Sequence, residues 1–188
     1  MTQRPTREQL EAARDRRLRD VVGPDLTVLL VGINPSLYSA AVGHHFARPG
    51  NRFWKALHAA GFTERLLRPS DDSTLPSRGI GITNLVARAT ASADELTTEE
   101  LRNGARRLER LVAKHTPAWV AVLGLGAYRT AFGRPGADVG PQPDRIGSAR
   151  VWLLPNPSGL NAHHQLPELT AAFRRLRVAA RLPSMTSR

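Results

Sequence analysis

Two short segments carry the side chains best suited to chemistry, and each follows an apolar run. Gly-Ile-Asn-Pro-Ser occupies residues 32–36, after the run 26–31, and Asn-Pro-Ser-Gly-Leu occupies residues 156–160, after the run 151–154. An asparagine carboxamide offers both a donor and an acceptor, which suits it to hold a water molecule or a polar ligand. In an open α/β sheet, ligands bind beyond the carboxyl ends of the strands. We therefore expect the two segments to form walls of one active site.

The elements that must position these segments alternate between strand and helix patterns, which is typical of a mainly parallel sheet covered by helices. Apolar runs predict strands at residues 26–31, 80–86, 119–123 and 151–154. Capping residues and amphipathic spacing predict helices at residues 6–20, 51–60, 97–115, 124–132 and from 167 onward. Residues 1–188 are expected to form a single α/β domain, with three α/β/α layers around a short, mainly parallel sheet.

The chain ends and one long connection complete this prediction. Thr6 and Gln9 have the spacing of a capping box, which predicts a charged N-terminal helix to about Asp20. Residues 183–188 are expected to be a frayed tail. Residues 133–148 are rich in Pro and Gly, which predicts a loop. We expect three tryptophans to pack in the core: Trp54, Trp119 and Trp152.

The composition indicates a polyanionic partner. The 188 residues include 27 basic and 16 acidic side chains, which gives a formal net charge of +11 and a sequence pI of about 11.5. Because Lys and Arg displace counterions when they bind phosphates, nucleic acid is the expected partner. For any single arginine, a solvated surface position is the alternative interpretation.

Several kinds of site are disfavoured. The chain has no Cys, which excludes disulfides, iron–sulfur clusters and thiolate zinc sites. The histidine pairs 44–45 and 163–164 have no carboxylate close in sequence, so we expect no metal. We interpret Asp71 and Asp72 as solvated loop residues, and Asp94 as a carboxylate that favours a helix start. No apolar run reaches the roughly 20 residues that cross a bilayer, so we expect a soluble cytoplasmic protein without membrane contact.

Four features occur in an order that resembles one enzyme family. They are the segments 32–36 and 156–160, Phe46, and the run Asn-Arg-Phe-Trp at 51–54. Over about Leu26–Arg177, the chain resembles the mismatch-specific uracil-DNA glycosylases, the family that includes thymine-DNA glycosylase. The resemblance implies the uracil-DNA glycosylase fold and an enzyme of base excision repair. Such an enzyme flips uracil, thymine or another damaged base out of mispaired duplex DNA and hydrolyses its N-glycosidic bond without a cofactor.

The resemblance also implies roles for single residues. Asn34 matches the catalytic position, whose carboxamide holds the attacking water beneath C1′. Phe46 matches the aromatic wall on which the flipped base stacks, and Leu160 matches the wedge that fills the gap left in the duplex. The other predicted site residues either line the base pocket (Ile33, Ser36, Ser39 and Asn156) or contact DNA (Ser158, Gly159 and Asn161).

Some positions carry residues that affect the implied chemistry. Ser36 stands where the first motif commonly has Gly, so its side chain is expected to narrow the pocket or disturb the water. Asn34 stands where other branches of the superfamily often have Asp, which implies slower chemistry that relies on leaving-group stability. Asn156 stands where other branches have His, which also indicates the mismatch-specific branch. Residues 161–164 have no clear match and are expected to contact the base opposite the lesion.

Three functions are consistent with these residues. Because no lysine lies near either motif, we expect a monofunctional glycosylase that forms no Schiff base with the sugar. One alternative is a glycosylase for deaminated purines, hypoxanthine or xanthine. Another is a non-catalytic DNA-binding module on the same fold, which the side chain at Ser36 suggests. The expected partner is double-stranded DNA with uracil or mismatches, bound by a monomer that is nucleoid-associated when on DNA.

Overall fold

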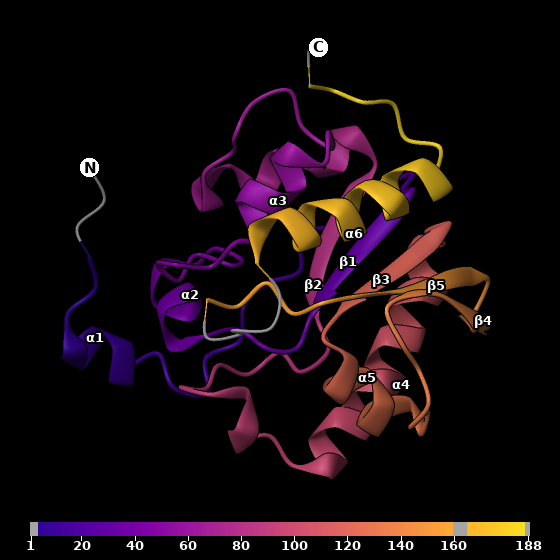
Figure 1. Cartoon of the computed structure of the whole chain (residues 1–188). Helices are drawn as coiled ribbons and strands as arrows, with labels where there is room; N and C mark the ends of the chain where they lie inside the picture. Colours follow the sequence, from indigo (N-terminus) through magenta and orange to yellow (C-terminus); the bar gives the residue numbers. More distant parts are fainter. Residues whose placement is uncertain (1–3, 160–164, 187–188) are drawn as a thin grey trace.

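The computed structural model describes residues 4–159 and 165–186, which form a five-stranded sheet between two layers of helices (Figure 1). The strand order is β2-β1-β3-β5-β4, and all neighbours are parallel except the antiparallel pair β4 and β5. The strands are β1 (Val28–Gly32), β2 (Ile80–Asn84), β3 (Trp119–Leu123), β4 (Gly140–Ile146) and β5 (Ala149–Leu154). The predicted α/β/α fold is confirmed.

The helices cover both faces of the sheet, because alternate strand side chains point to opposite faces. Leu30 packs with α3 and α6, and its neighbour Leu29 packs with α4 and α5; both leucines are fully buried. The helices are α1 (Arg7–Glu11), α2 (Leu37–Val42), α3 (Phe53–Ala59), α4 (Thr98–His115), α5 (Leu125–Phe132) and α6 (Leu166–Ala179), with 3-10 turns η1 (Pro69–Thr74), η2 (Pro76–Arg78) and η3 (Ala93–Glu95). No helix in the described ranges is long and apolar enough to cross a membrane.

Local signals in the sequence define several of these elements. The capping box of α4 is present, since Glu100 N donates to Thr97 Oγ1 at 3.1 Å and Thr97 N donates to Glu100 Oε2 at 2.8 Å. The helix ends at His115, as predicted. Trp119 and Trp152 meet edge to face in the core with ring centroids 5.8 Å apart, which confirms their predicted burial.

The predicted N-terminal helix to Asp20 is wrong beyond Glu11. The capping box of α1 forms, but Asp15 has a φ of 61°, which ends any helical path. The chain then runs antiparallel to the edge strand β2 and its continuation, with Val21 opposite Ile82. Backbone hydrogen bonds to the open edge at β2 replace the helical hydrogen bonds that the sequence pattern favours.

The predicted loop 133–148 is also wrong in part, because it contains β4. Pro141 and Pro143 cannot donate to a sheet, but β4 is an edge strand with an irregular register between Pro141 and Arg145. At the C-terminus, Met185 N donates to Gly61 O at 2.8 Å and fixes the described part of the tail.

Candidate active site

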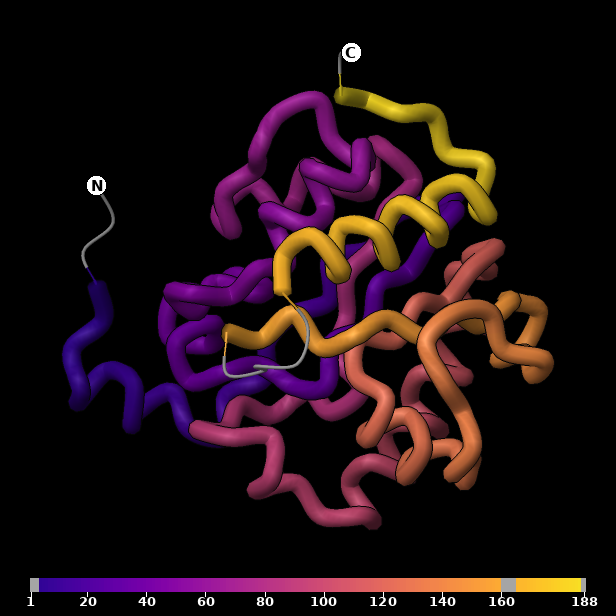
Figure 2. The backbone as a smooth tube through the Cα atoms, in the orientation of Figure 1, coloured from indigo at the N-terminus to yellow at the C-terminus, as the bar shows by residue number. Residues whose placement is uncertain are grey.

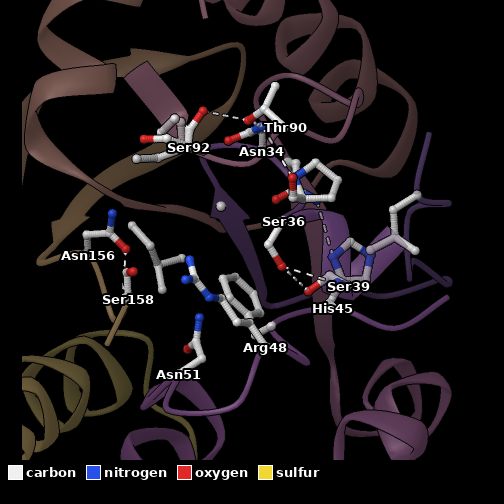
Figure 3. Close-up of a pocket in the computed structure, with 18 of the residues that line it drawn as sticks. Asn34, Ser36, Ser39, His45, Arg48, Asn51, Thr90, Ser92, Asn156 and Ser158 are labelled. Atoms are coloured by element: carbon white, nitrogen blue, oxygen red, sulfur yellow. Dashed lines mark hydrogen bonds between the residues drawn. The ribbon is translucent and has the colours of Figure 1, made fainter. Parts of the chain in front are cut away.

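A cavity of about 310 Å³ opens at the carboxyl ends of the parallel strands (Figure 3). Asn34 follows β1 and Asn156 follows β5, and both side chains line this cavity. Their strands are separated in the sheet by β3, which is followed by Gly124 with a φ of 143°. A Cβ at Gly124 would lie 2.9 Å from Ile33 Cδ1, so glycine lets the first motif pack closely against the end of β3. The predicted convergence of the motifs is confirmed.

The carboxamide of Asn34 is held by the chain that follows β2. Its Nδ2 donates to Thr90 Oγ1 at 2.6 Å and lies 3.2 Å from Arg88 O, and Figure 3 shows this nitrogen turned toward Thr90. The Thr90 hydroxyl donates to Ser92 O at 2.7 Å, so its oxygen is oriented to accept. Because Nδ2 is committed to these partners, Oδ1 is the atom of the carboxamide that can accept a hydrogen bond from a bound water.

Phe46 forms an aromatic wall of the same cavity. Its φ is 52°, and its ring stacks on Phe53 with centroids 3.9 Å apart and planes inclined by 15°. A Cβ at Gly32 would lie 3.1 Å from Phe46 Cζ and 2.5 Å from Asn84 Oδ1. Glycine at the end of β1 therefore lets the ring and the Asn84 carboxamide approach the floor of the cavity.

Ser36 and Ser39 line the cavity, as the sequence predicts, and both hydroxyls also support its walls. Ser36 Oγ accepts from Ser39 N at 3.1 Å and caps α2. Ser39 Oγ accepts from Ala47 N at 3.1 Å, which ties α2 to the turn that presents Phe46. The serine that departs from the family pattern therefore begins a helix, and its hydroxyl points toward Ser39 (Figure 3).

The second motif is bound to the start of α3. Arg52 N donates to Pro157 O at 3.0 Å, and Arg52 Nη2 donates to Ser158 O at 2.5 Å. Asn156 Oδ1 accepts from Ser158 N at 3.0 Å, which closes a local turn. The run Asn-Arg-Phe-Trp therefore supports the wall that carries Asn156.

Packing within the protein also requires glycine at position 159, besides the predicted contact of this residue with DNA. A Cβ at Gly159 would lie 2.6 Å from Gly50 O, so the two backbones approach as closely as glycine allows. Leu160, the predicted wedge, and Asn161, a predicted DNA contact, lie outside the described residues, as do all of residues 161–164, which are predicted to contact the base opposite the lesion.

A sequence profile described as the uracil DNA glycosylase superfamily matches residues 20–178. The chain belongs to this superfamily. The fold is also similar to the solution NMR structure of a candidate uracil DNA glycosylase from Methanosarcina acetivorans, with a TM-score of 0.52 and 21% sequence identity. The similarity covers 87% of this chain and 98% of that chain, which shows a shared fold.

This member of the superfamily has pocket residues that sequence reasoning missed. Thr90, Ser92 and Asp94 follow β2, and Arg48 and Asn51 follow α2. The interpretation of Asp94 as a helix-start carboxylate is incomplete, because it lies in η3 and also lines the cavity. The position of Thr90, Ser92 and Asp94 in the sequence could have indicated this role, because polar residues that follow a buried parallel strand often line the ligand crevice.

A buried polar network contributes His45 and Asn84 to the lining of the cavity and connects them to more distant residues. His45 is 2% exposed, and its Nε2 donates to Arg19 O at 2.8 Å, which leaves Nδ1 to accept from Asn84 Nδ2 at 3.4 Å. Burial lowers the pKa of His45 below its ordinary value of 6.5. Asp72 is 5% exposed and accepts from His45 N at 3.2 Å, so its interpretation as a solvated carboxylate is wrong. No group of three or more His, Asp or Glu that could hold a metal occurs among residues 4–159 and 165–186.

Proposed function

We propose that the protein is a monofunctional DNA glycosylase that removes uracil from mispaired duplex DNA. The observation that carries this proposal is the fixed carboxamide of Asn34, which shares one cavity with Phe46 and Asn156. Membership of the uracil DNA glycosylase superfamily supports glycosidic bond cleavage as the reaction class. The mismatch preference is inferred from the asparagines of the two motifs.

The reaction follows from the chemistry of these groups. A water held by Asn34 Oδ1 bonds through its oxygen to C1′ as the bond from C1′ to the base breaks, and the electron pair leaves with the base. Solvent takes the proton from the attacking water and protonates the departing base. Because a carboxamide is not a strong base, Asn34 contributes mainly by positioning, and the rate depends on stabilisation of the anionic base.

The flipped base would lie between Phe46 and the segment that contains Asn156. Stacking on an aromatic ring accepts any planar base, so hydrogen bonds from the backbone and carboxamides must select the pyrimidine. The net charge of +11 supports DNA as the partner, because phosphates bound by arginine release their counterions. We place Ser158 and Gly159 beside the backbone of the flipped nucleotide.

Single-turnover release of free base tests the proposal. Duplexes with G:U, A:U, G:T or a hypoxanthine pair are incubated with wild-type protein and with Asn34→Ala. We expect the fastest release from G:U and a loss of at least about a hundredfold with Asn34→Ala, at similar DNA affinity. Faster release of hypoxanthine would assign the pocket to deaminated purines. DNA binding without release from any duplex would contradict the glycosylase proposal.

A borohydride trap tests the monofunctional part separately. A Schiff base between an amine of the protein and the sugar would be reduced to a stable protein–DNA adduct. We expect released base without an adduct, and an adduct that forms at the rate of base release would contradict the prediction.

A further inference from the structure

A segment outside the matched superfamily region contributes to the cavity. The profile begins at residue 20, yet Leu18 lines the cavity and is only 8% exposed. We call residues 13–19 the strap, because they run beside the chain that leaves the edge strand β2 (Figure 2). Ala13 at the start of the strap is fully buried, so side chains near both ends of the strap, Ala13 and Leu18, are packed in the protein.

The strap is joined by backbone hydrogen bonds to residues 85–90, the chain that leaves β2. Asp15 N donates to Ala89 O at 3.1 Å, and Ala89 N donates to Arg16 O at 2.9 Å. Ala89 is fully buried, so water does not compete readily for these bonds. The outer edge of residues 85–90 is therefore paired with the strap.

The inner edge of residues 85–90 holds the first motif. Thr90 N donates to Pro35 O at 3.2 Å, and Leu37 N donates to Thr90 O at 3.2 Å. The same segment supplies Arg88 O and Thr90 Oγ1, the two oxygen atoms nearest to Asn34 Nδ2, and Pro35 O lies 3.3 Å from this nitrogen. Residues 85–90 are thus the middle of three adjacent chain segments, with the strap on one side and Asn34 on the other.

Side chains reinforce the outer pairing. Arg88 Nη1 donates to Asp15 Oδ1 at 3.0 Å, and Arg14 Nη1 donates to Glu95 Oε2 at 2.7 Å. Arg88 Nε also donates to Glu100 Oε1 at 2.5 Å, and this guanidinium holds the pKa of Glu100 at about 2. The charged groups of the strap are exposed, so these ion pairs contribute little to the free energy of unfolding. Their main effect is to hold the strap in position against residues 85–90.

We propose that the strap is a positioning element of the active site. By holding residues 85–90 from outside, it fixes the carbonyl of Arg88 and the hydroxyl of Thr90, and through them the carboxamide of Asn34. The proposal rests on the proposed catalytic role of Asn34. Because a displacement of about 1 Å at a water-positioning group can slow chemistry a hundredfold, loosening the strap is expected to reduce the rate of base release.

The test loosens the strap in the full-length protein without removing a buried group. The variant Arg14→Ala/Asp15→Asn removes the tie to Glu95 and the charge of the tie to Arg88, and Asn tolerates the φ of 61° at position 15. The matched control, Arg134→Ala/Asp144→Asn, breaks an exposed 2.6 Å ion pair that joins the end of α5 to β4. We expect a roughly five- to tenfold slower single-turnover release for the strap variant, no change for the control, and unchanged DNA affinity and melting temperature for both.

A second comparison separates positioning from a general structural effect. In an Asn34→Ala background, the strap variant should cause no further loss of rate, because the group that it positions is gone. An equal loss in both backgrounds would overturn the proposal. A loss of DNA affinity at an unchanged rate would also overturn it, since the strap would then be a DNA-binding surface.

A readout that needs no activity keeps the two proposals distinguishable. In the strap variant, we expect faster amide hydrogen exchange at Ala89 and Thr90 and shifted side-chain amide resonances of Asn34. If wild-type protein releases no base from any duplex, the proposed function fails, and these spectra alone decide the strap proposal. Unchanged exchange and resonances would overturn it.

Discussion

Thr90 Oγ1 lies 2.6 Å from Asn34 Nδ2, although the two residues are 56 positions apart in sequence. Thr90 is 1% exposed, and its hydroxyl donates to Ser92 O, so the proton of this hydroxyl points away from Asn34. The carboxamide therefore has one favoured orientation, with its nitrogen toward Thr90. A small change at Thr90 should reach the chemistry without touching the substrate.

Thr90→Val should slow base release about tenfold with little change in DNA affinity. Valine keeps the volume but removes the acceptor, so the Asn34 amide loses a hydrogen bond worth about 1 kcal/mol and its fixed orientation. Single-turnover rates and binding to uncleaved DNA measure the two effects. Thr90→Ser, which keeps the hydroxyl, is the control, and equal losses for both variants would contradict the prediction.

Gly32→Ala should strongly reduce base release and lower the melting temperature. The added Cβ would lie 2.5 Å from Asn84 Oδ1 and 3.1 Å from Phe46 Cζ, so the floor and the aromatic wall must both shift. Such overpacking costs roughly 1–3 kcal/mol. Gly136→Ala is the matched control, because its Cβ meets nothing within 4 Å. A wild-type rate of base release in Gly32→Ala would contradict the prediction, because Asn84 and Phe46 could then move without affecting the reaction.

Arg48→Ala should lower the affinity for DNA and make this affinity less dependent on the salt concentration. Arg48 is exposed at the cavity, where Figure 3 shows its guanidinium near Asn51, and we expect it to bind a phosphate beside the flipped nucleotide. The slope of log K against log salt should fall by about 0.9, the value for one phosphate contact. Arg145→Ala, in β4, is the control. A slower release at unchanged affinity would instead place Arg48 at the departing base.

The free energy of unfolding should fall with acidity below about pH 6.5 because of His45. Burial lowers the pKa of His45 in the folded state, so the unfolded chain binds a proton first as the pH decreases through 6.5. The loss continues until the pH passes the folded pKa, and above pH 6.5 this group contributes no slope. Urea unfolding between about pH 8 and pH 5 measures the effect.

The control for this pH dependence is His45→Gln, which keeps a buried side chain that can donate to Arg19 O but does not titrate. We expect the acid-dependent slope near pH 6 to become smaller in this variant. An unchanged slope would assign the pH dependence to other groups.

The sequence predicted those parts of the fold whose signals are local. Thr97 and Glu100 form the capping box that their spacing indicates, and the buried runs became strands because both faces are covered by helices. Asn34 and Asn156 met in one cavity because parallel strands place their carboxyl ends at the same edge.

The parts that were missed depend on contacts distant in sequence. The sequence pattern predicts that the strap continues a helix to about Asp20. An extended path is more favourable only because the open edge of β2 offers partners for its backbone hydrogen bonds. Pro141 and Pro143 argue against a strand unless the strand is known to lie at the sheet edge. Thr90 belongs to no motif, so its contact with Asn34 is visible only in the folded chain.

The strand order also determines when the cavity is completed during synthesis. β2 and β3 pair on either side of β1, and β5 extends the sheet from β3, so each parallel strand after β1 is made later than a strand with which it pairs. A nascent chain that ends between residues 90 and 156 therefore contains Asn34 and Thr90 but lacks Asn156 in the opposite wall. The cavity is therefore complete only after the segment that follows β5 has left the ribosome, which makes its assembly one of the last steps of folding during synthesis.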